Sequence, residues 1–155
     1  MLNEKGTIKE YDLKVYPIHF VIAIGDLEKE VNKLYKPYDE AYNWIGHPGK
    51  EHPACTYRVK NKKTGNACVL VWIPKIDDFR GSYICHEAGH STLEIFSYIG
   101  AKVSYNDQEP FCYLLGVIFK CCNQSYYELK DFLDKKKSKK PKKRNKYGIT
   151  RYCII

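Results

Sequence analysis

Residues 82–96 read SYICHEAGHSTLEIF, and the interpretation of the whole chain starts from this stretch. Its apolar residues recur at helical spacing, which predicts an amphipathic helix that begins near Ser82 and stops at Gly100. Because helical residues turn by about 100°, His86 and His90 should lie ~40° apart and ~6 Å along the axis, with Glu87 on the same side. Two imidazoles in this register can bind one cation, and H-E-x-x-H is typical of zinc hydrolases.

The sequence before this helix predicts a strand, a helix and a loop. Residues 13–24 are rich in β-branched and apolar side chains and predict a buried strand. Asp26 is a candidate N-cap for a helix over residues 27–35. Residues 36–53 contain Pro, Gly, Asn and His, which favour a loop.

Closer to the motif, a glycine-containing connection at residues 62–66 predicts a β-hairpin whose second strand is residues 67–73. After the motif helix, the sequence NDQEP predicts the start of a buried helix that runs to Cys122. A shorter helix is expected over residues 125–134. The predicted order is β-α-β-β-α-α, which is an α+β domain.

A catalytic zinc site needs a third protein ligand besides two histidines. Glu94 lies ~12 Å along the helix from His86, too far to share one ion with both histidines. Glu109 follows His90 after the chain has had room to reverse at Gly100, and it would project back from the first turn of the next helix. Asp107 is the second candidate. An acid at a helix start also has a structural explanation, because it interacts favourably with the helix dipole.

The motif with Glu109 resembles the zincin metallopeptidases, in the gluzincin arrangement of two histidines and a downstream glutamate. Residues 85–116, CHEAGHSTLEIFSYIGAKVSYNDQEPFCYLLG, are similar to small zincin-like proteins of bacteriophages and integrated elements of gut bacteria. The resemblance implies that His86, His90 and Glu109 bind Zn²⁺ and that Glu87 is the catalytic base acting on a peptide or protein substrate. It also implies a small domain in which a short antiparallel sheet packs on the motif helix and a following buried helix. Strand 67–73 would edge the cleft.

A peptidase also needs a group that stabilises the oxyanion formed on the scissile carbonyl. The chain has no histidine after His90, so that role falls to another residue type. Tyr113, one turn after Glu109, is the first candidate, and Tyr105 and Arg80 are alternatives.

The net charge of +8 is concentrated in residues 135–155, which hold ten Lys or Arg and no acid. We therefore expect a domain over residues 1–134 and a basic, flexible tail over residues 135–155. Such a tail is either a solubilising extension or a nonspecific contact for nucleic acid or another polyanion. The residues proposed for that contact are Lys139, Lys140, Lys142, Lys143 and Arg144.

The rest of the composition indicates a cytoplasmic protein, in a host cell if the chain is phage-encoded. No run approaches the ~20 apolar residues that span a bilayer, and the N-terminus lacks the pattern of a signal peptide. Seven scattered cysteines without a C-x-x-C pair suggest reduced thiols. A zinc-dependent metallopeptidase is the first function hypothesis. The alternative is a nucleic-acid-associated binding protein with a structural or inactive zincin-like site, and a protease acting on DNA-bound proteins would combine the two. The oligomeric state is not indicated.

Overall fold

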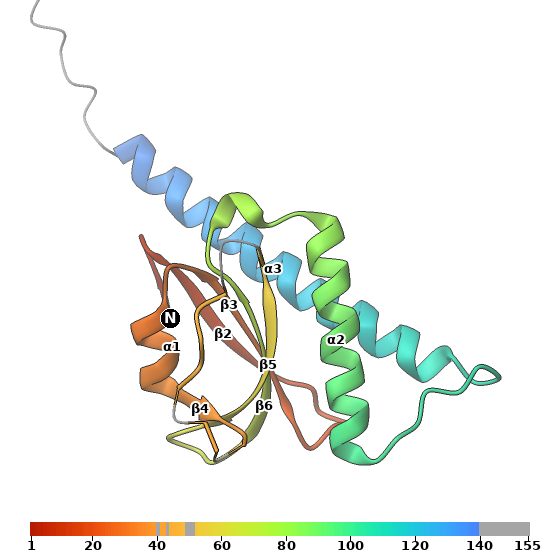
Figure 1. Ribbon diagram of the computed structural model, residues 1–155. Coiled ribbons are helices and arrows are strands. Elements are labelled where there is room, and N and C mark those ends of the chain that lie inside the picture. Colours follow the sequence, from red (N-terminus) through yellow and green to blue (C-terminus); the bar gives the residue numbers. More distant parts are fainter. Residues whose placement is uncertain (40, 43, 49–51, 140–155) are drawn as a thin grey trace, which may run out of the picture.

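The computed structural model describes residues 1–39, 41–42, 44–48 and 52–139. They form an α+β fold, as predicted: a six-stranded sheet is followed by two long helices that pack against it (Figure 1). The elements are β1 (Leu2–Asn3), β2 (Gly6–Asp12), β3 (His19–Gly25), α1 (Glu28–Leu34), β4 (Tyr35–Pro37), β5 (Cys55–Asn61), β6 (Ala67–Ile73), a 3₁₀ turn (Ile76–Asp78), α2 (Gly81–Ile99) and α3 (Glu109–Lys139).

The sheet is mixed rather than purely antiparallel, which corrects the expectation from the family resemblance. Its strand order is β1-β2-β3-β6-β5-β4, and β3 and β6 run parallel at the centre while all other neighbours are antiparallel. Both central strands are nearly continuous apolar runs, HFVIAIG and ACVLVWI, and are buried on both faces. Runs of this kind suit the middle of a sheet that is covered by helices on either side.

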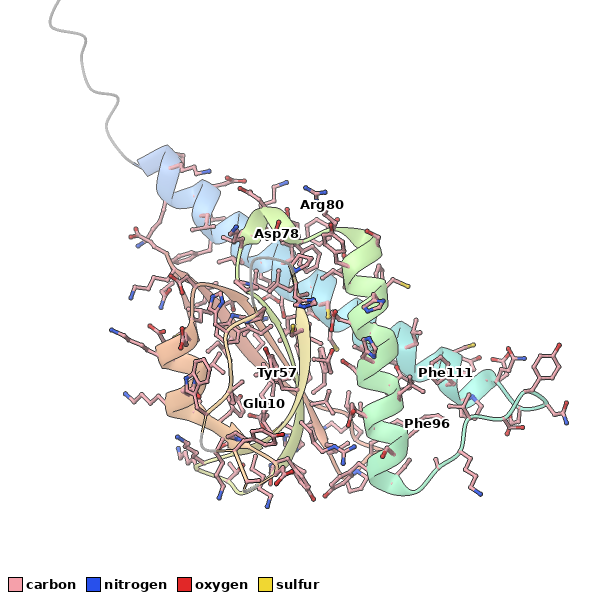
Figure 2. The ribbon with its side chains drawn as sticks, in the orientation of Figure 1. Glu10, Tyr57, Asp78, Arg80, Phe96 and Phe111 are labelled. Carbon is pink, nitrogen blue, oxygen red and sulfur yellow. The ribbon has the colours of Figure 1, made fainter. Side chains whose placement is uncertain are left out.

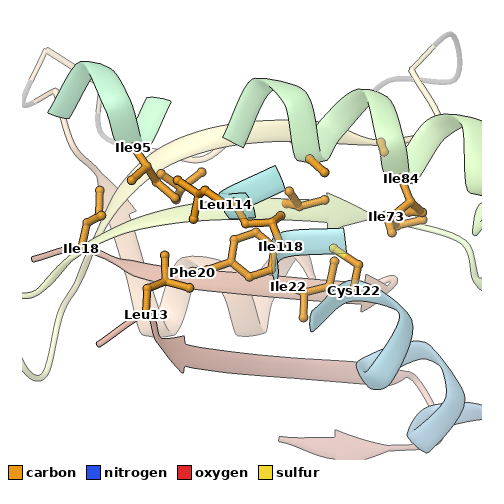
Figure 3. Packing of buried hydrophobic residues seen from close by; sticks show 14 of the residues in the cluster. Leu13, Ile18, Phe20, Ile22, Ile73, Ile84, Ile95, Leu114, Ile118 and Cys122 are labelled. Atoms are coloured by element: carbon orange, nitrogen blue, oxygen red, sulfur yellow. The ribbon is translucent and has the colours of Figure 1, made fainter. Parts of the chain in front are cut away.

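The helices form one layer on each face of the sheet. Helix α1 covers one face, and α2 and α3 cover the other (Figure 1). The core on the α2–α3 face contains Phe20 and Ile22 of β3, Ile84 and Ile95 of α2, and Ile118 of α3 (Figure 3). These side chains are fully buried, so α2 is fixed against the sheet along its length.

The predicted bounds of the motif helix are confirmed. Helix α2 runs from Gly81 to Ile99 and ends at Gly100, whose φ of 71° is the left-handed conformation that glycine adopts without strain. Ile84, Ala88, Ile95 and Phe96 form its buried face, as the helical spacing predicts. The hairpin is also confirmed, and its second strand matches the predicted residues 67–73.

The N-terminal prediction needs several corrections. Strand β1 was not predicted, and β4, Tyr35–Pro37, occupies the end of the predicted helix and the start of the predicted loop. Strand β3 starts at His19, and residues 13–18 lead into it without being part of a strand. Strand β2, Gly6–Asp12, was not predicted, because Lys9, Glu10 and Asp12 interrupt the apolar pattern of its sequence GTIKEYD. Asp26 does not cap α1, since Leu27 occupies the N-cap position and no side chain bonds to the first amides.

The two helices predicted after residue 105 are one helix. Helix α3 contains 31 residues, and Pro110 stands in its first turn as expected. No glycine or proline separates Cys122 from Ser125, so nothing interrupts the hydrogen-bonded ladder there. Only one face is buried, whereas the sequence predicted burial on nearly every side; Tyr113, for example, is 73% exposed.

The predicted boundary at residue 134 falls inside α3, which continues to Lys139. Residues 140–155, including most of the predicted basic tail, lie outside the described residues. Among the helices of the described part of the chain, none is long and apolar enough to cross a membrane.

Candidate metal and catalytic site

The two motif histidines point their Nε2 atoms at each other. The Nε2 atoms of His86 and His90 are 3.0 Å apart, and their rings meet edge to face with centroids 4.5 Å apart. Tetrahedral zinc with Zn–N bonds of ~2.05 Å would hold two such nitrogens about 3.3 Å apart. The observed separation is therefore within a few tenths of an ångström of a coordinating pair. Both rings are exposed, so an ion can reach them from solvent.

Glu87 lies beside this pair but is held by the neighbouring strand. Its side chain is only 7% exposed, and its Oε2 accepts a hydrogen bond of 2.6 Å from the Thr56 hydroxyl on β5. The same hydroxyl also lies 3.3 Å from the Glu87 carbonyl oxygen. Thr56 faces α2 because alternate β5 side chains point to that side of the sheet. The carboxylate is thus fixed between helix and strand.

One hollow of about 430 Å³ contains these groups. One wall is α2, with His86, Glu87, His90 and Glu94, and the other is β5 with the residues that precede it. The second wall is formed by His52, Ala54, Cys55, Thr56 and Tyr57. The strand that edges the cleft is therefore β5. The expectation that residues 67–73 edge it is wrong, because β6 lies between β3 and β5 inside the sheet.

In the described part of the chain, β4 pairs with only the second half of β5. Strand β4 pairs with Val59, Lys60 and Asn61, and the amide of Tyr38 donates to the Arg58 carbonyl. Within the described residues, no strand pairs with the outer edge of Cys55–Tyr57. This part of the strand, Cys55–Tyr57, is also the part that lines the hollow.

An ion pair closes the hollow on the side of the α2 C-terminus. Arg58 Nε donates to Glu94 Oε2 at 2.9 Å, and the same guanidinium contacts Ser97. Glu94 was rejected as a metal ligand because of its distance along the helix, and the structure gives its carboxylate a different role, as the partner of Arg58. This pair ties α2 to β5 seven residues beyond Glu87.

Burial controls the protonation of the other polar groups in the hollow. It raises the pKa of the Cys55 thiol and raises that of the Tyr57 phenol, so both are neutral near pH 7. The Tyr57 hydroxyl donates to the Gly46 carbonyl at 2.7 Å, which joins β5 to the loop before it. The carboxyl groups that line the hollow are those of Glu87 and Glu94, and both belong to α2.

Glu109 and Asp107 are not brought to the histidine pair. Glu109 is exposed at the start of α3, in a separate shallow hollow, and Asp107 lines another. The start of α3 is held near the end of α2 by an edge-to-face contact between Phe111 and Phe96 (Figure 2). Phe96 is six residues beyond His90, about 9 Å along the axis. Within the described ranges, no group of three His, Cys, Asp or Glu side chains is arranged to hold an ion, and Glu109 stays a prediction.

The predicted oxyanion partners are also away from the hollow. Tyr113 shares the exposed surface of α3 with Glu109, and Tyr105 is 90% exposed in the loop before that helix. Arg80 precedes α2 (Figure 2). Its guanidinium carbon lies 5.8 Å from the centre of the Tyr83 ring. Of the residues proposed for polyanion contact, Lys140, Lys142, Lys143 and Arg144 lie outside the described residues, and Lys139 is the last residue of α3.

Five residues of the hollow were missed at the sequence level: His52, Ala54, Cys55, Thr56 and Tyr57. They come from the run HPACTY, which the sequence marks only as the end of a loop and the start of a hairpin. A histidine just before an expected strand was the one available signal. Their proximity to α2 follows from the pairing of β5 with β6 and the packing of α2 on both strands, which no local pattern encodes.

Comparison with protein-family models, with curated proteins and with solved structures found no match for this chain.

Proposed function

We propose that the protein is a small zinc-dependent metallopeptidase, encoded by a phage or mobile element. One observation carries the proposal: two Nε2 atoms converge to 3.0 Å on one helix, with a buried carboxylate one residue from the first histidine. The two rings are also at hydrogen-bond distance, so the pair supports a metal site together with the buried carboxylate beside it and not by its spacing alone. A buried carboxylate beside them is what a proton-transfer role needs.

His86 and His90 would hold the zinc ion. When bound, zinc polarises a scissile carbonyl and makes water a stronger acid. Two of the three protein ligands that such a site needs are supported by the pair, because neutral imidazole is a usual zinc ligand and the spacing suits chelation. Glu109 is our proposed third ligand on the strength of the sequence, with Asp107 second. His52 is a further candidate because it lines the same hollow as the pair.

Glu87 is our proposed general base. Its carboxylate would accept a proton from the attacking water as the new C–O bond forms. It would then deliver that proton to the amide nitrogen as the C–N bond breaks, so that an acid and an amine leave. Thr56 supports this role by fixing one carboxylate oxygen, which leaves the other to face the substrate. Purely structural zinc sites have no need of such a base.

A peptide substrate is favoured by the part of β5, Cys55–Tyr57, that pairs with no second neighbouring strand among the described residues. An extended peptide can add to a free strand edge through main-chain hydrogen bonds, and Cys55–Tyr57 offers such an edge next to Glu87. The alternative proposal is a nucleic-acid-associated binding protein with an inactive site, supported by the ten bases of residues 135–155. Glu87 favours the peptidase, because binding alone does not use it.

The test is to purify the full chain with zinc, measure bound metal, and follow cleavage of an unstructured protein such as casein. His86→Ala and His90→Ala should each lower zinc content from about one ion per chain to near zero. Glu87→Gln should keep the ion while cleavage falls by a factor of about a thousand or more, as expected for loss of a general base in a metal site. Thermal shift with and without chelator gives a readout of the ion that does not depend on activity.

Glu109→Ala and His52→Ala, compared in the same preparation, identify the third ligand by which of them lowers zinc affinity. Lys102→Ala, in the exposed loop between α2 and α3, is the matched control and should leave both zinc affinity and cleavage unchanged. Full zinc content in both histidine variants would contradict the metal site. Unchanged cleavage in Glu87→Gln would contradict the catalytic role.

A further inference from the structure

A second, larger hollow of about 520 Å³ lies beside the candidate site. Its walls come from the segment between β4 and β5, from β5 itself and from Glu94 of α2. Aromatic rings dominate it: Tyr38, Tyr42, Trp44 and Tyr57. No role in metal binding or proton transfer uses this space.

The two hollows adjoin each other along β5, with the Arg58–Glu94 pair at their common border. Tyr57 and Glu94 line both of them, so they share a wall on the strand and a wall on the helix. Thr56 marks the level of Glu87, and Arg58 marks the level of Glu94. These strand positions are two residues apart, about 6.6 Å in an extended chain. If an extended peptide places one residue at Glu87, a residue one or two positions along that peptide lies at the aromatic hollow.

The aromatic hollow presents apolar surface to solvent. Tyr42 is 66% exposed and Trp44 is 53% exposed, while Ile45 between Trp44 and Gly46 is buried at 2% and anchors the segment. Large exposed rings gathered around a concave surface are typical of sites that bury an apolar group of a ligand.

The charged side chains at this hollow balance, because the acids Glu94 and Asp39 stand against the bases Arg58 and Lys60. Glu94 is paired with Arg58. The ring of Tyr38 has the guanidinium of Arg58 at 5.7 Å and the ammonium of Lys60 at 4.8 Å. Asp39 Oδ1 accepts a hydrogen bond from the Ala41 amide at 2.9 Å. With the charges balanced, the rings of Tyr42 and Trp44 are the main surface that a ligand meets, and they suit a neutral aromatic or large aliphatic side chain.

We propose that the aromatic hollow is the specificity pocket of the enzyme and takes a large apolar side chain, such as Phe, Tyr, Trp, Leu or Met, of the peptide substrate. This assignment rests on the proposed peptidase function and adds the substrate class. The residue that enters the pocket stands one or two positions from the cleaved bond. Burial of such a side chain against the rings raises kcat/KM about tenfold to a hundredfold over alanine at that position.

The first arm of the test measures cleavage by the zinc-loaded full chain. Peptides of alanine and glycine carry a single Phe, Leu or Lys that is moved along the sequence. Cleavage should occur one or two residues from Phe or Leu. Trp44→Ala should lower kcat/KM for the Phe peptides at least tenfold, with much less effect on the residual cleavage of peptides without a large residue. Tyr127→Ala, which removes a ring of similar exposure from α3, should leave both unchanged.

The second arm measures binding without turnover. Tryptophan fluorescence of Glu87→Gln is followed while N-acetyl-Ala-Phe-Ala-amide or its Ala and Lys counterparts are added. Trp72, the other tryptophan, is fully buried, so a change in signal reports Trp44. Saturable change with the Phe peptide alone, weakened by Tyr42→Ala, is expected.

The pocket and the peptidase can fail separately. Cleavage without preference for a large apolar residue, cleavage directed by Lys, or a uniform effect of Trp44→Ala on all peptides would overturn the pocket while the peptidase stands. If no zinc is bound and no peptide is cut, the proposal of a peptidase fails. The fluorescence measurement then decides whether the proposal of an apolar pocket stands. Selective binding of the Phe peptide then still supports an apolar side-chain pocket, and equal or absent binding of all three overturns it.

Discussion

The hydrogen bond between Thr56 and Glu87 gives the sharpest test of the site's architecture. It is short, at 2.6 Å, its acceptor is a carboxylate, and that carboxylate is only 7% exposed. Hydrogen bonds to charged groups contribute about 1.5–3 kcal/mol, against about 0.5–1.5 kcal/mol for neutral pairs. Thr56→Val keeps the shape of the side chain and removes only the hydroxyl, so the carboxylate loses its partner without a cavity being formed.

We expect Thr56→Val to lower the free energy of unfolding by about 1.5–3 kcal/mol at pH 7. The measurement is urea denaturation in a double-mutant cycle with Glu87→Ala. It is done with a chelator present, so that no bound ion adds to the stability. The coupling free energy of the cycle should carry most of the loss, and Thr56→Ser should restore most of it.

Thr92→Val is the matched control, because the Thr92 hydroxyl bonds to the neutral Ala88 carbonyl at 2.8 Å on the same helix. It should cost about 0.5–1.5 kcal/mol and show almost no coupling to Glu87→Ala. A coupling free energy below about 0.5 kcal/mol between Thr56 and Glu87 would refute the view that the strand holds the carboxylate in place.

Two further predictions concern pH and thiol chemistry. The pKa of Glu128 is lowered, mainly by the hydrogen bond from Lys9; its stabilising effect is therefore present above the ordinary glutamate pKa of about 4.3 and is lost as the pH falls through the lowered value. Glu128→Gln should cost about 0.2–1 kcal/mol in urea denaturation at pH 7 and nothing near pH 3, and an equal cost at both would rule out the ion pair as the cause. Iodoacetamide at pH 7.5 should modify exposed Cys85 in the folded chain but Cys68 only after unfolding, because Cys68 is buried and its pKa is raised to about 12 by that burial; mass spectrometry of the digested protein reads both sites.

Elements with strong local signals were predictable from the sequence. The spacing of Ile84, Ala88 and Ile95, with Gly100 after them, determined helix α2 to within a residue. The apolar run of β6 between a glycine-containing turn and Pro74 did the same for that strand. In both cases the apolar spacing and the glycine or proline at its boundary indicate the same element with the same limits. Strand β2 lacks this agreement, because its charged residues are stabilised by pairing with β3 and not by a pattern of its own.

Long-range contacts were not predictable in the same way. The sequence placed His86, Glu87 and His90 together because all three share a helix. It placed Glu109 near them by assuming a reversal of the chain after Gly100, whereas the start of α3 packs against Phe96 at the far end of α2. Thr56 reaches Glu87 only through the order of strands in the sheet, which depends on contacts distant in the sequence.

Strands β5 and β6 and helix α2 follow one another closely in the sequence, and this order affects how the site forms as the chain folds. All residues of the histidine-containing hollow lie between His52 and Glu94, joined by one hairpin and one short connection. The parallel pairing of β3 with β6, by contrast, must close a loop of more than forty residues, which is entropically slower. Substitutions in β1 or β2 should therefore alter the fraction of molecules that is folded, while each folded molecule keeps the same spatial relation between the histidines and the strand beside them.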